Sequence, residues 1–534
     1  MRNLEGLRGR AVAAALFLVA AFAVAAQAFD RDGLEVINRN YAALMSALEA
    51  DPSGGVDAPL NAAYQLLNHG EHRPATSDSA ASVRGTPDME TEDPARQGAV
   101  GKALLAPLLQ KVALETGSMG HRELMEASAP SGGEVLIVKS GALTLGSLPA
   151  ALQSRGWSDL LTGADGKYLL KMPLVILEDG VFVIEPGDEL EMATDRGAFI
   201  LNFGSLAITD ALVKGSAAQP RLPDFHPFIQ TARGGRAAIT GSRFTGLGFD
   251  ARPLMSGLSF ASSPFATQKS RGVVHDNVFD DVRSVEVTGI DDFEFVRNRI
   301  QHARGIGLRL EQLKGGTIRD NVIVASGMHG ILAIGSTGLD IDGNIAAENG
   351  GRGFFGRDGI GHLTVSDNVL VANREEGISI AGGSCVDIRG NAVLRNRQDG
   401  ITIAQSLGIR LAGNLLVRNQ GSGISINDSI SPADSVEVSQ NRFVANNVGL
   451  SAERFATIRL SGNNFSDQLP VLFGDALQYE TPRYLGWARS NGEKPDAVFE
   501  ISSARGGSPL IFQGDSTGMF RLSDMTGCHF KELD

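Results

Sequence analysis

The chain has 534 residues, enough to bury a large core, and its length favours one large domain with appendages. Glycine reaches 65 residues while aromatic residues make up 6% of the chain, which disfavours a bulky helical core and favours a fold with many tight turns. The formal net charge of −13 excludes an overall electrostatic basis for nucleic-acid binding, which requires clustered lysine and arginine. An anionic ligand would therefore need a local basic patch.

The first residues are typical of a secretory signal peptide. Arg2, Arg8 and Arg10 precede an uncharged run over 11–26, and a small-x-small sequence ends at Ala28. The run of about sixteen apolar residues is short for a membrane span, which needs roughly twenty. We therefore predict a signal peptide over 1–28, no membrane span after its cleavage, and a periplasmic or secreted location.

Three segments precede the β-rich part of the chain. Residues 29–70 carry apolar positions at helical spacing and are predicted to form a small helical appendage. Residues 71–97 are polar, contain proline and have almost no aliphatic side chains, which is the composition of a flexible linker. A further helix is expected over 98–115, within a helix and connection that run from 98 to 132.

From residue 133 the pattern changes to short apolar runs separated by turn residues, which is typical of strands. We assign 133–484 to one β domain, with regular coils at about 265–466 and a small insertion near 427–434. The segment 485–534 contains further strand-like pieces and is predicted to cap the open end of the stack.

A repeat of about 23 residues dominates the β domain. Asparagines that in most cases precede an apolar pair recur with spacings of 21, 23, 23, 24, 23, 23, 27 and 22 residues. They are Asn277, Asn298, Asn321, Asn344, Asn368, Asn391, Asn414, Asn441 and Asn463. Glycines that precede a strand keep step with them, at Gly307, Gly330, Gly353, Gly377, Gly400, Gly423 and Gly449. A second set of asparagines does the same, at Asn349, Asn373, Asn396, Asn419 and Asn446.

This period, with apolar residues alternating inside each repeat, predicts one coil of a parallel β-helix rather than a helical solenoid. Leucine-rich repeats share the period, but their leucine frame is absent. Stacked asparagines can hydrogen-bond the coils above and below, so we expect them to be structural. The predicted fold class is all-β, a right-handed parallel β-helix with a small N-terminal helical appendage.

The two cysteines, Cys385 and Cys528, lie far apart and lack the spacing of zinc ligands or of a disulfide framework. A single bridge in an oxidising compartment stays open, but we expect each to be a lone small apolar side chain. No stretch has the dense Asp-x-Asp spacing of a calcium loop. We expect no metal site and no obligatory cofactor.

The order of elements from about 133 to 480 resembles the periplasmic mannuronan C5-epimerase family, which builds alginate. The local strings that carry the resemblance are His226-Pro227-Phe228, the stretch 241–250, His329-Gly330 and Asp399-Gly400-Ile401-Thr402. The resemblance implies a β-helix that acts on a uronic-acid polymer, with an anionic polysaccharide as its partner. Other exopolysaccharide-export proteins are further candidate partners.

The sequence departs from this family at its hallmark, an Asp-Pro-His-Asp-Arg-Ser segment that follows a Gly-Ile pair. Here the pair Gly305-Ile306 is followed by Gly307, Leu308 and Arg309, so the hallmark aspartate and histidine have no counterpart at these positions. The standard chemistry of the family is therefore not carried over, and whether the chain is an enzyme stays open.

Removal of the proton beside a uronate carboxylate needs a cation on the carboxylate, a base near C5 and an acid. The residue before each strand-leading glycine supplies these types in successive coils: Ile306, His329, Arg352, Glu376, Asp399 and Ser422. We predict His329 as a base with a pKa near neutrality and Arg352 as the cation. Glu376 and Asp399 would be the acid and an orienting group. The alternatives are a turn histidine and an ordinary salt-bridge ladder.

Substrate contacts are predicted for residues that flank this column or face outward on its strands. They are Arg309, Arg357, Ser379, Thr402 and Ser425. Three functions remain open: an epimerase or related uronan-modifying enzyme, which we prefer; a β-helix lyase or glycosidase; and a non-catalytic guide for a nascent polymer. An enzyme would thus be an isomerase or a polysaccharide lyase.

Overall fold

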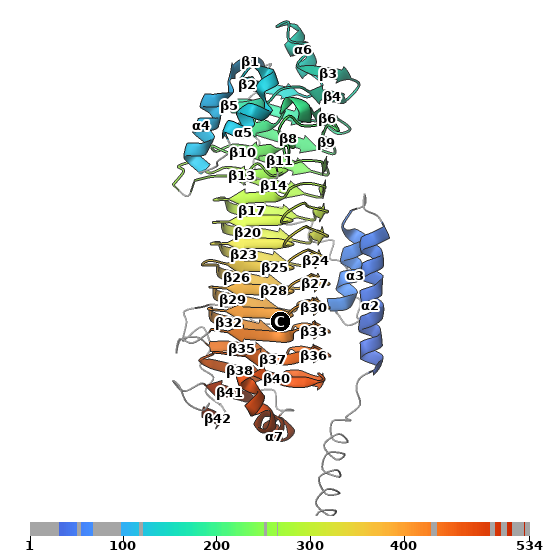
Figure 1. The fold of residues 1–534 in the computed structure, drawn as a ribbon, viewed down its shortest axis with the longest axis vertical. Coiled ribbons are helices and arrows are strands. Elements are labelled where there is room, and N and C mark those ends of the chain that lie inside the picture. The colour runs from blue at the N-terminus through green and yellow to red at the C-terminus, as the bar shows by residue number, and fades with distance from the viewer. Residues whose placement is uncertain are drawn as a thin grey trace, which may run out of the picture.

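The computed structural model describes residues 31–50, 55–67, 98–116, 121–249, 254–263, 265–428, 435–491, 497–502, 510–514 and 528. Strands stack coil on coil into one long solenoid (Figure 1). The predicted right-handed parallel β-helix is confirmed. The predicted signal peptide, the linker 71–97 and most of the insertion near 427–434 lie outside the described residues. Within the described part, no helix is both long and apolar enough to cross a membrane.

Each regular coil contributes one strand to each of three parallel sheets. Sheet 1 contains β7 (Ile200–Asn202), β10 (Ile229–Thr231), β13 (Leu258–Ala261), β16 (Val285–Thr288), β19 (Leu308–Glu311), β22 (Ile331–Ile334), β25 (Phe354–Arg357), β28 (Ile378–Ala381), β31 (Ile401–Ala404), β34 (Ser422–Asn427), β37 (Val448–Ala452) and β40 (Val471–Asp475). Sheet 2 contains β8 (Ser205–Thr209), β11 (Arg236–Thr240), β14 (Arg271–His275), β17 (Asp291–Val296), β20 (Lys314–Arg319), β23 (Thr337–Asp342), β26 (Gly361–Ser366), β29 (Ser384–Arg389), β32 (Leu407–Ala412), β35 (Ser435–Ser439) and β38 (Thr457–Ser461). Sheet 3 contains β6 (Glu189–Met192), β9 (Leu212–Gly215), β12 (Arg243–Thr245), β15 (Val278–Asp280), β18 (Arg299–Gln301), β21 (Val322–Val324), β24 (Ile345–Ala347), β27 (Val369–Val371), β30 (Ala392–Leu394), β33 (Leu415–Val417), β36 (Arg442–Val444) and β39 (Asn464–Asp467).

A ladder of asparagines fills the corner between sheets 2 and 3. The side-chain nitrogen of Asn391 donates to the side-chain oxygen of Asn414 at 3.0 Å, and its own oxygen accepts from the backbone N–H of Asn368 at 2.9 Å. The residue before the ladder position has a positive φ, 63° at Gly390, so the chain turns sharply there. The predicted structural role of these asparagines is confirmed.

The second asparagine ladder, between sheets 3 and 1, explains the glycine register. A Cβ on Gly330 would lie 2.7 Å from the carbonyl oxygen of Gly353 and 2.8 Å from the side-chain nitrogen of Asn349. A larger residue would therefore push the coils apart. Glycine recurs because the strand passes directly against the ladder.

The N-terminal helices α2 (Arg31–Ala50) and α3 (Asp57–Leu67) cover the outer face of sheet 3, which confirms the helical appendage (Figure 1). The strands of sheet 3 from β21 to β33 are apolar on both faces: Leu370 points into the solenoid core, whereas Val369 and Val371 pack with the helices. The guanidinium of Arg395 lies 4.1 Å from the ring centre of Tyr41. Burial of this second apolar face fixes the helices to the solenoid.

The helix expected over 98–115 is wrong at its start. Residues 99–104 form β1 (Ala99–Leu104), antiparallel to β2 (Glu134–Thr144), because β2 would otherwise present an unpaired edge. The helix begins only at α4 (Leu105–Thr116) and, with α5 (His121–Ala127), packs on the outer face of the first coils. The other N-terminal elements are η2 (Ala129–Ser131), α6 (Leu148–Gln153), β3 (Leu161–Ala164), β4 (Lys167–Leu170), β5 (Leu174–Ile184) and η3 (Thr194–Arg196).

The C-terminal end of the stack is closed by η4 (Ala476–Glu480), α7 (Thr481–Asn491), β41 (Val498–Ser502) and β42 (Leu510–Gly514). Tyr484 of α7 packs on Phe473, with ring centres 5.0 Å apart, and Trp487 packs on Phe499 at 5.4 Å. These aromatic rings cover the last coil and shield the core from water.

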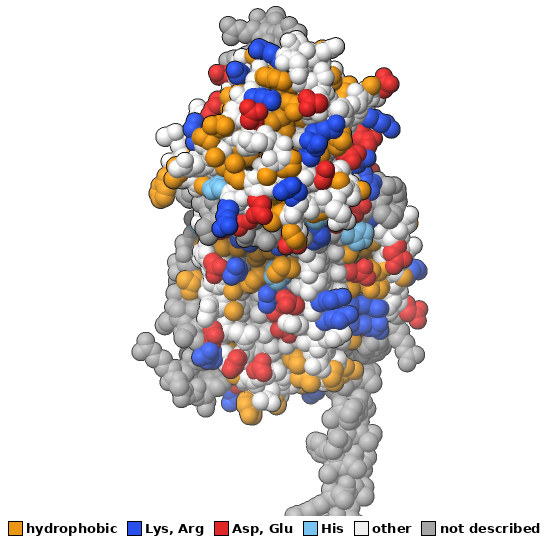
Figure 2. Space-filling view, turned by 45° about the horizontal axis from the view of Figure 1, so that its top comes forward, with side chains coloured by type: hydrophobic (Ala, Val, Ile, Leu, Met, Phe, Trp, Pro, Cys, Tyr) orange, Lys and Arg blue, Asp and Glu red, His pale blue; other side chains and the backbone are white. Residues whose placement is uncertain are grey.

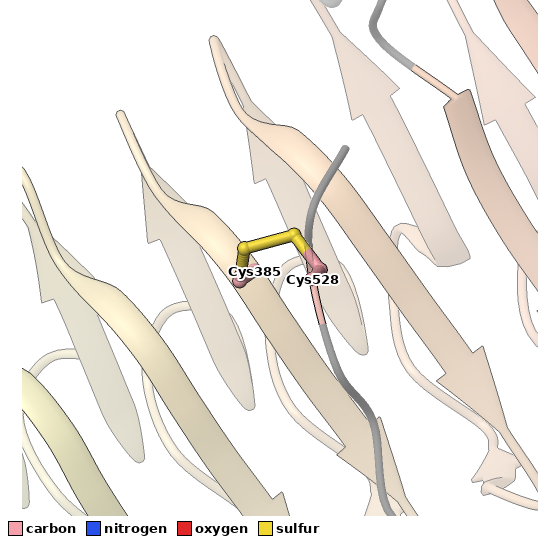
Figure 3. Close-up of a disulfide and its surroundings, with 2 residues drawn as sticks. All are labelled: Cys385 and Cys528. Carbon is pink, nitrogen blue, oxygen red and sulfur yellow. A yellow bond between two sulfur atoms is a disulfide. The ribbon is translucent and has the colours of Figure 1, made fainter. Parts of the chain in front are cut away.

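The expectation of two lone cysteines is wrong. Cys385 on β29 forms a disulfide with Cys528, with Cα atoms 5.2 Å apart (Figure 3). The two residues are 143 positions apart in the chain. Their spacing gave no sign of pairing because the bridge depends on Cys528 lying against β29.

We expect the substitution Asn391→Ala to lower the free energy of unfolding by about 2–3 kcal/mol, because backbone groups in the adjacent coils lose their partners in a dry corner. Thermal unfolding followed by circular dichroism measures the effect. Asn447→Ala, at an exposed position, is the matched control and should change the midpoint little. Equal effects of the two variants would contradict a structural ladder.

We expect loss of the disulfide by Cys385→Ser to lower stability by about 2–4 kcal/mol, because the unfolded chain regains the freedom of a long loop. A reductant should lower the thermal midpoint of the unsubstituted protein to that of the variant, while leaving the variant unchanged. A midpoint insensitive to reductant would show that the bridge contributes no stability.

Candidate functional site

The outer face of sheet 1 is the candidate site. The described helices pack on sheet 3 and on the first coils, so from β19 to β34 this face carries no described helix. One outward residue on each of these six strands lies in register with the outward residue of the next strand. These residues are Arg309, Leu332, Phe355, Ser379, Thr402 and Ser425. They form one column across successive coils, about 4.8 Å apart.

A second column, called here the titratable column, comprises His329, Arg352, Glu376 and Asp399. The carbonyl oxygen of each accepts the N–H of a strand-leading glycine in the preceding coil, at 2.9–3.1 Å. This regular pattern stacks the four residues along the edge of sheet 1. The structure thus brings together the four residues that the sequence singled out.

His329 is held as a neutral ring. Its Nδ1 accepts the backbone N–H of Arg352 at 3.0 Å, and its ring packs edge-on against Phe355, with centres 5.4 Å apart. Burial, reinforced by the positive charge of Arg352, lowers the pKa of His329 to about 4. The expected pKa near neutrality is therefore wrong. With Nδ1 occupied, the proton of the neutral ring is assigned to Nε2, which makes His329 a hydrogen-bond donor.

Arg352 is already paired with acidic residues. Its Nε lies 2.8 Å from Oε2 of Glu376, and its NH1 lies 3.4 Å from Oε2 of Glu375. The guanidinium also stacks on Phe355, at 4.3 Å from the ring centre. A substrate carboxylate at Arg352 would therefore compete with these glutamates for the guanidinium.

Asp399 differs from Glu376 in its surroundings. Its two oxygens accept from the backbone N–H of Ser422 at 2.6 Å and from the hydroxyl of Thr402 at 3.1 Å. Burial raises the pKa of Asp399, and the nearby negative charge of Glu376 raises it further. Two neighbouring carboxyl groups, one facing an arginine and one with a raised pKa, can serve as base and acid.

The predicted substrate-binding residues differ in their exposure and in their bonding partners. Arg309 pairs with Glu311 at 2.7 Å, and Arg357 pairs with Asp358 at 3.2 Å. Ser379 and Ser425 are each only 5% exposed, whereas Thr402 is half-buried and bonded to Asp399. On the face shown in Figure 2, acidic and basic side chains are interspersed over most of the surface, and a group of basic side chains lies together at the lower right.

Two further residues of this site, Phe355 and Glu375, were not predicted from the sequence. Phe355 contacts His329, Arg352 and Arg357, and it is the aromatic member of an outward column that otherwise holds small or aliphatic side chains after Arg309. Its place in the strand register was a signal that could have identified it. The role of Glu375 depends on the direction of its side chain in the turn, which spacing does not reveal.

Comparison with known proteins gives a family model and several relatives. Residues 314–465 match the family described as right handed beta helix region. A mannuronan C5-epimerase of Pseudomonas fluorescens is 24% identical over 257 residues, which are 46% of this chain and 45% of that protein. The mannuronan C5-epimerase AlgG of Azotobacter vinelandii is 28% identical over 126 residues, 23% of each chain. The chain thus aligns with less than half the length of either relative.

Solved structures show the same fold. A variant of the periplasmic alginate epimerase AlgG superposes with a TM-score of 0.55 at 19% identity, over 72% of this chain and 87% of that chain. A doubly substituted variant gives a TM-score of 0.55 at 18% identity, over 76% and 92%. At this identity the likeness establishes the architecture, and the chemistry must be argued from the residues present.

We expect His329 to stay neutral down to about pH 4–5, because its folded-state pKa lies near 4. Between pH 6.5 and 4 the unfolded state binds the proton more strongly, so stability falls as pH falls. His329→Gln retains an acceptor and should lose less stability over this interval, by an amount on the order of 3 kcal/mol. NMR titration of the imidazole and unfolding midpoints against pH measure both effects. A ring that titrates near pH 6.5 would contradict this assignment.

Proposed function

Because this right-handed parallel β-helix protein resembles the mannuronan C5-epimerases, we propose that it binds and modifies a uronic-acid polysaccharide along the outer face of sheet 1. The observation that carries the proposal is the pair Glu376 and Asp399, beside the cation Arg352, on a face that no described helix covers. These groups are the base, the acid and the carboxylate partner that C5 epimerisation needs.

In this proposal the uronate carboxylate binds Arg352 and displaces Glu376 from the guanidinium. Glu376, an ionised carboxylate released from its cation, then takes the proton from C5. Asp399 holds a proton to higher pH than an ordinary aspartate and returns one to the opposite face of the sugar. The Nε2–H of His329 donates to an oxygen of the substrate as negative charge develops there.

The absence of the family hallmark after Ile306 agrees with a reactive site at a different position along the solenoid. Arg309, which stands where the hallmark histidine would be, is occupied by Glu311. The groups proposed for proton transfer, Glu376 and Asp399, instead lie in the coils of β28 and β31. The proton transfers are thus proposed three to four coils further along the solenoid than Gly307.

A glycosidase is the second candidate, and the two carboxyl groups favour it. A retaining or inverting hydrolase uses one protonated and one ionised carboxyl group across the scissile bond. Asp399, with its raised pKa, and Glu376 fit these roles without any cation on the substrate. A lyase shares the first proton abstraction with an epimerase and differs in the bond that breaks next.

A location outside the cytoplasm agrees with this function. The AlgG protein with the same fold is described as periplasmic. The disulfide between Cys385 and Cys528 is of a kind that persists in oxidising compartments. We therefore propose that the chain is periplasmic or secreted, where it meets exported polysaccharide.

The test is incubation of the purified protein with polymannuronate in deuterated water. Exchange at C5 without chain cleavage is the expected result, followed by NMR. Absorbance of unsaturated ends would indicate a lyase, and new reducing ends without unsaturation would indicate a glycosidase. Binding with none of these changes would make the protein a non-catalytic guide and would overturn the enzymatic proposal.

We expect Asp399→Asn to lower the measured rate by at least about 100-fold, because the acid is lost while the acceptor for the Ser422 N–H can be retained. Asp195→Asn, an exposed carboxylate outside the site, is the charge-matched control. A rate unchanged by Asp399→Asn, in a protein of unchanged thermal midpoint, would remove Asp399 from the site.

A further inference from the structure

A pocket of about 350 Å³ lies where sheet 1 turns into sheet 2 in the early coils. Its lining includes Gly234, Arg236, Gln268, Lys269, Arg271 and Asp291. We call it the basic pocket. The basic pocket lies at the start of strands β11, β14 and β17, in coils that precede those of the titratable column, β22 to β31. The mechanism proposed above does not use this pocket.

The two arginines of the basic pocket are neighbours, and the part of the chain that the structure describes gives them no acidic partner. Arg236 pairs in register with Arg271 on adjacent strands, so their side chains leave the sheet about 4.8 Å apart. Like charges in this position destabilise a sheet. Among the described residues, neither guanidinium has an ion pair or hydrogen bond, whereas Lys269 is neutralised by Asp291 at 2.6 Å. In a chain of net charge −13, two unpaired positive charges here point to an anionic ligand.

One wall of the basic pocket is a loop whose base is firmly held. The backbone N–H of Ser270 donates to the hydroxyl of Ser262 at 2.7 Å, and the hydroxyl of Ser270 donates to the carbonyl of Ala261 at 3.1 Å. Within the loop, Phe265 precedes the lining residue Ala266 and is 93% exposed. An exposed aromatic side chain beside a polar pocket offers a flat apolar surface for a sugar ring.

We propose that the basic pocket is a second binding site for an acidic oligosaccharide, in which Arg236 and Arg271 pair with carboxylates of the bound chain and Phe265 contacts a ring. The two arginine side chains leave the sheet about 4.8 Å apart, so both can reach carboxylates that one bound chain presents to the pocket. Bidentate pairing with a carboxylate would offset the repulsion between the two guanidinium groups. The choice of ligand rests on the proposed function, whereas the pocket and its charge do not.

The test is calorimetric titration of the full chain carrying Arg352→Gln, with a mannuronate oligomer of defined length, so that the titratable column contributes little. In this background we expect Arg236→Gln and Arg271→Gln each to weaken binding about tenfold or more, since each removes a charged hydrogen-bond donor. Phe265→Ala should weaken it about fivefold. Arg489→Gln in α7, at the opposite end of the solenoid, is the charge-matched control and should leave binding unchanged (Figure 1).

Separate outcomes distinguish this inference from the proposed function. A neutral oligosaccharide that binds equally well, inorganic phosphate that competes at equal concentration, or affinity unchanged by both arginine variants would each overturn the acidic-sugar site. Because the like-charge pair is lost, neither arginine variant should lower the thermal midpoint. If no C5 exchange occurs but binding still depends on Arg236 and Arg271, the proposed function fails while the second site stands.

Discussion

The structure depends on the hydrogen-bonded ladders of asparagine side chains at the corners of the coil. Each ladder amide, such as Asn391, bonds both to the coil above and to the coil below, so a shift of one corner out of register would break two contacts at once. The corner also requires a left-handed residue before the ladder position. Together these constraints hold the repeat near 23 residues and leave insertions to the outer turns.

The same constraint positions the titratable column. The second ladder leaves no room for a Cβ on Gly330, and the N–H of this glycine bonds to the carbonyl of Arg352. The residue before each such glycine is therefore carried to the same corner in every coil. A site built this way is rigid in its backbone, and it can vary from coil to coil only in the side chains it presents.

Electrostatics separates the two candidate ligand sites. In the titratable column the charge of Arg352 is compensated by two glutamates, and the ring of His329 is neutral, so an anionic substrate must exchange partners to enter. Such a site is suited to a change of ionisation during a reaction. In the basic pocket, Arg236 and Arg271 lack partners among the described residues, which suits steady binding rather than proton transfer.

The appended helices decide which face of the solenoid stays open. Sheet 3 buries its outward side chains, among them Val369 and Val371, under α2 and α3, while α4 and α5 cover the first coils. The three-residue apolar strands from β21 to β33 in sheet 3 indicate in the sequence that this sheet is covered, because a strand without alternation is buried on both faces. Helical spacing predicted the two helices, but it did not reveal that they pack on those strands.

Residue spacing was enough to predict the β-helix, its ladders and the stacking of His329 to Asp399, because a repeat converts spacing along the chain directly into position on the solenoid. The state of these side chains came from the folded structure alone. The neutral ring of His329 follows from its burial and from the hydrogen bond that it accepts from the backbone N–H of Arg352 in the next coil. The disulfide follows from the position of Cys528 beside β29. Burial, charge pairing and contacts between distant segments depend on side-chain direction and on the path of the whole chain, which residue spacing does not encode.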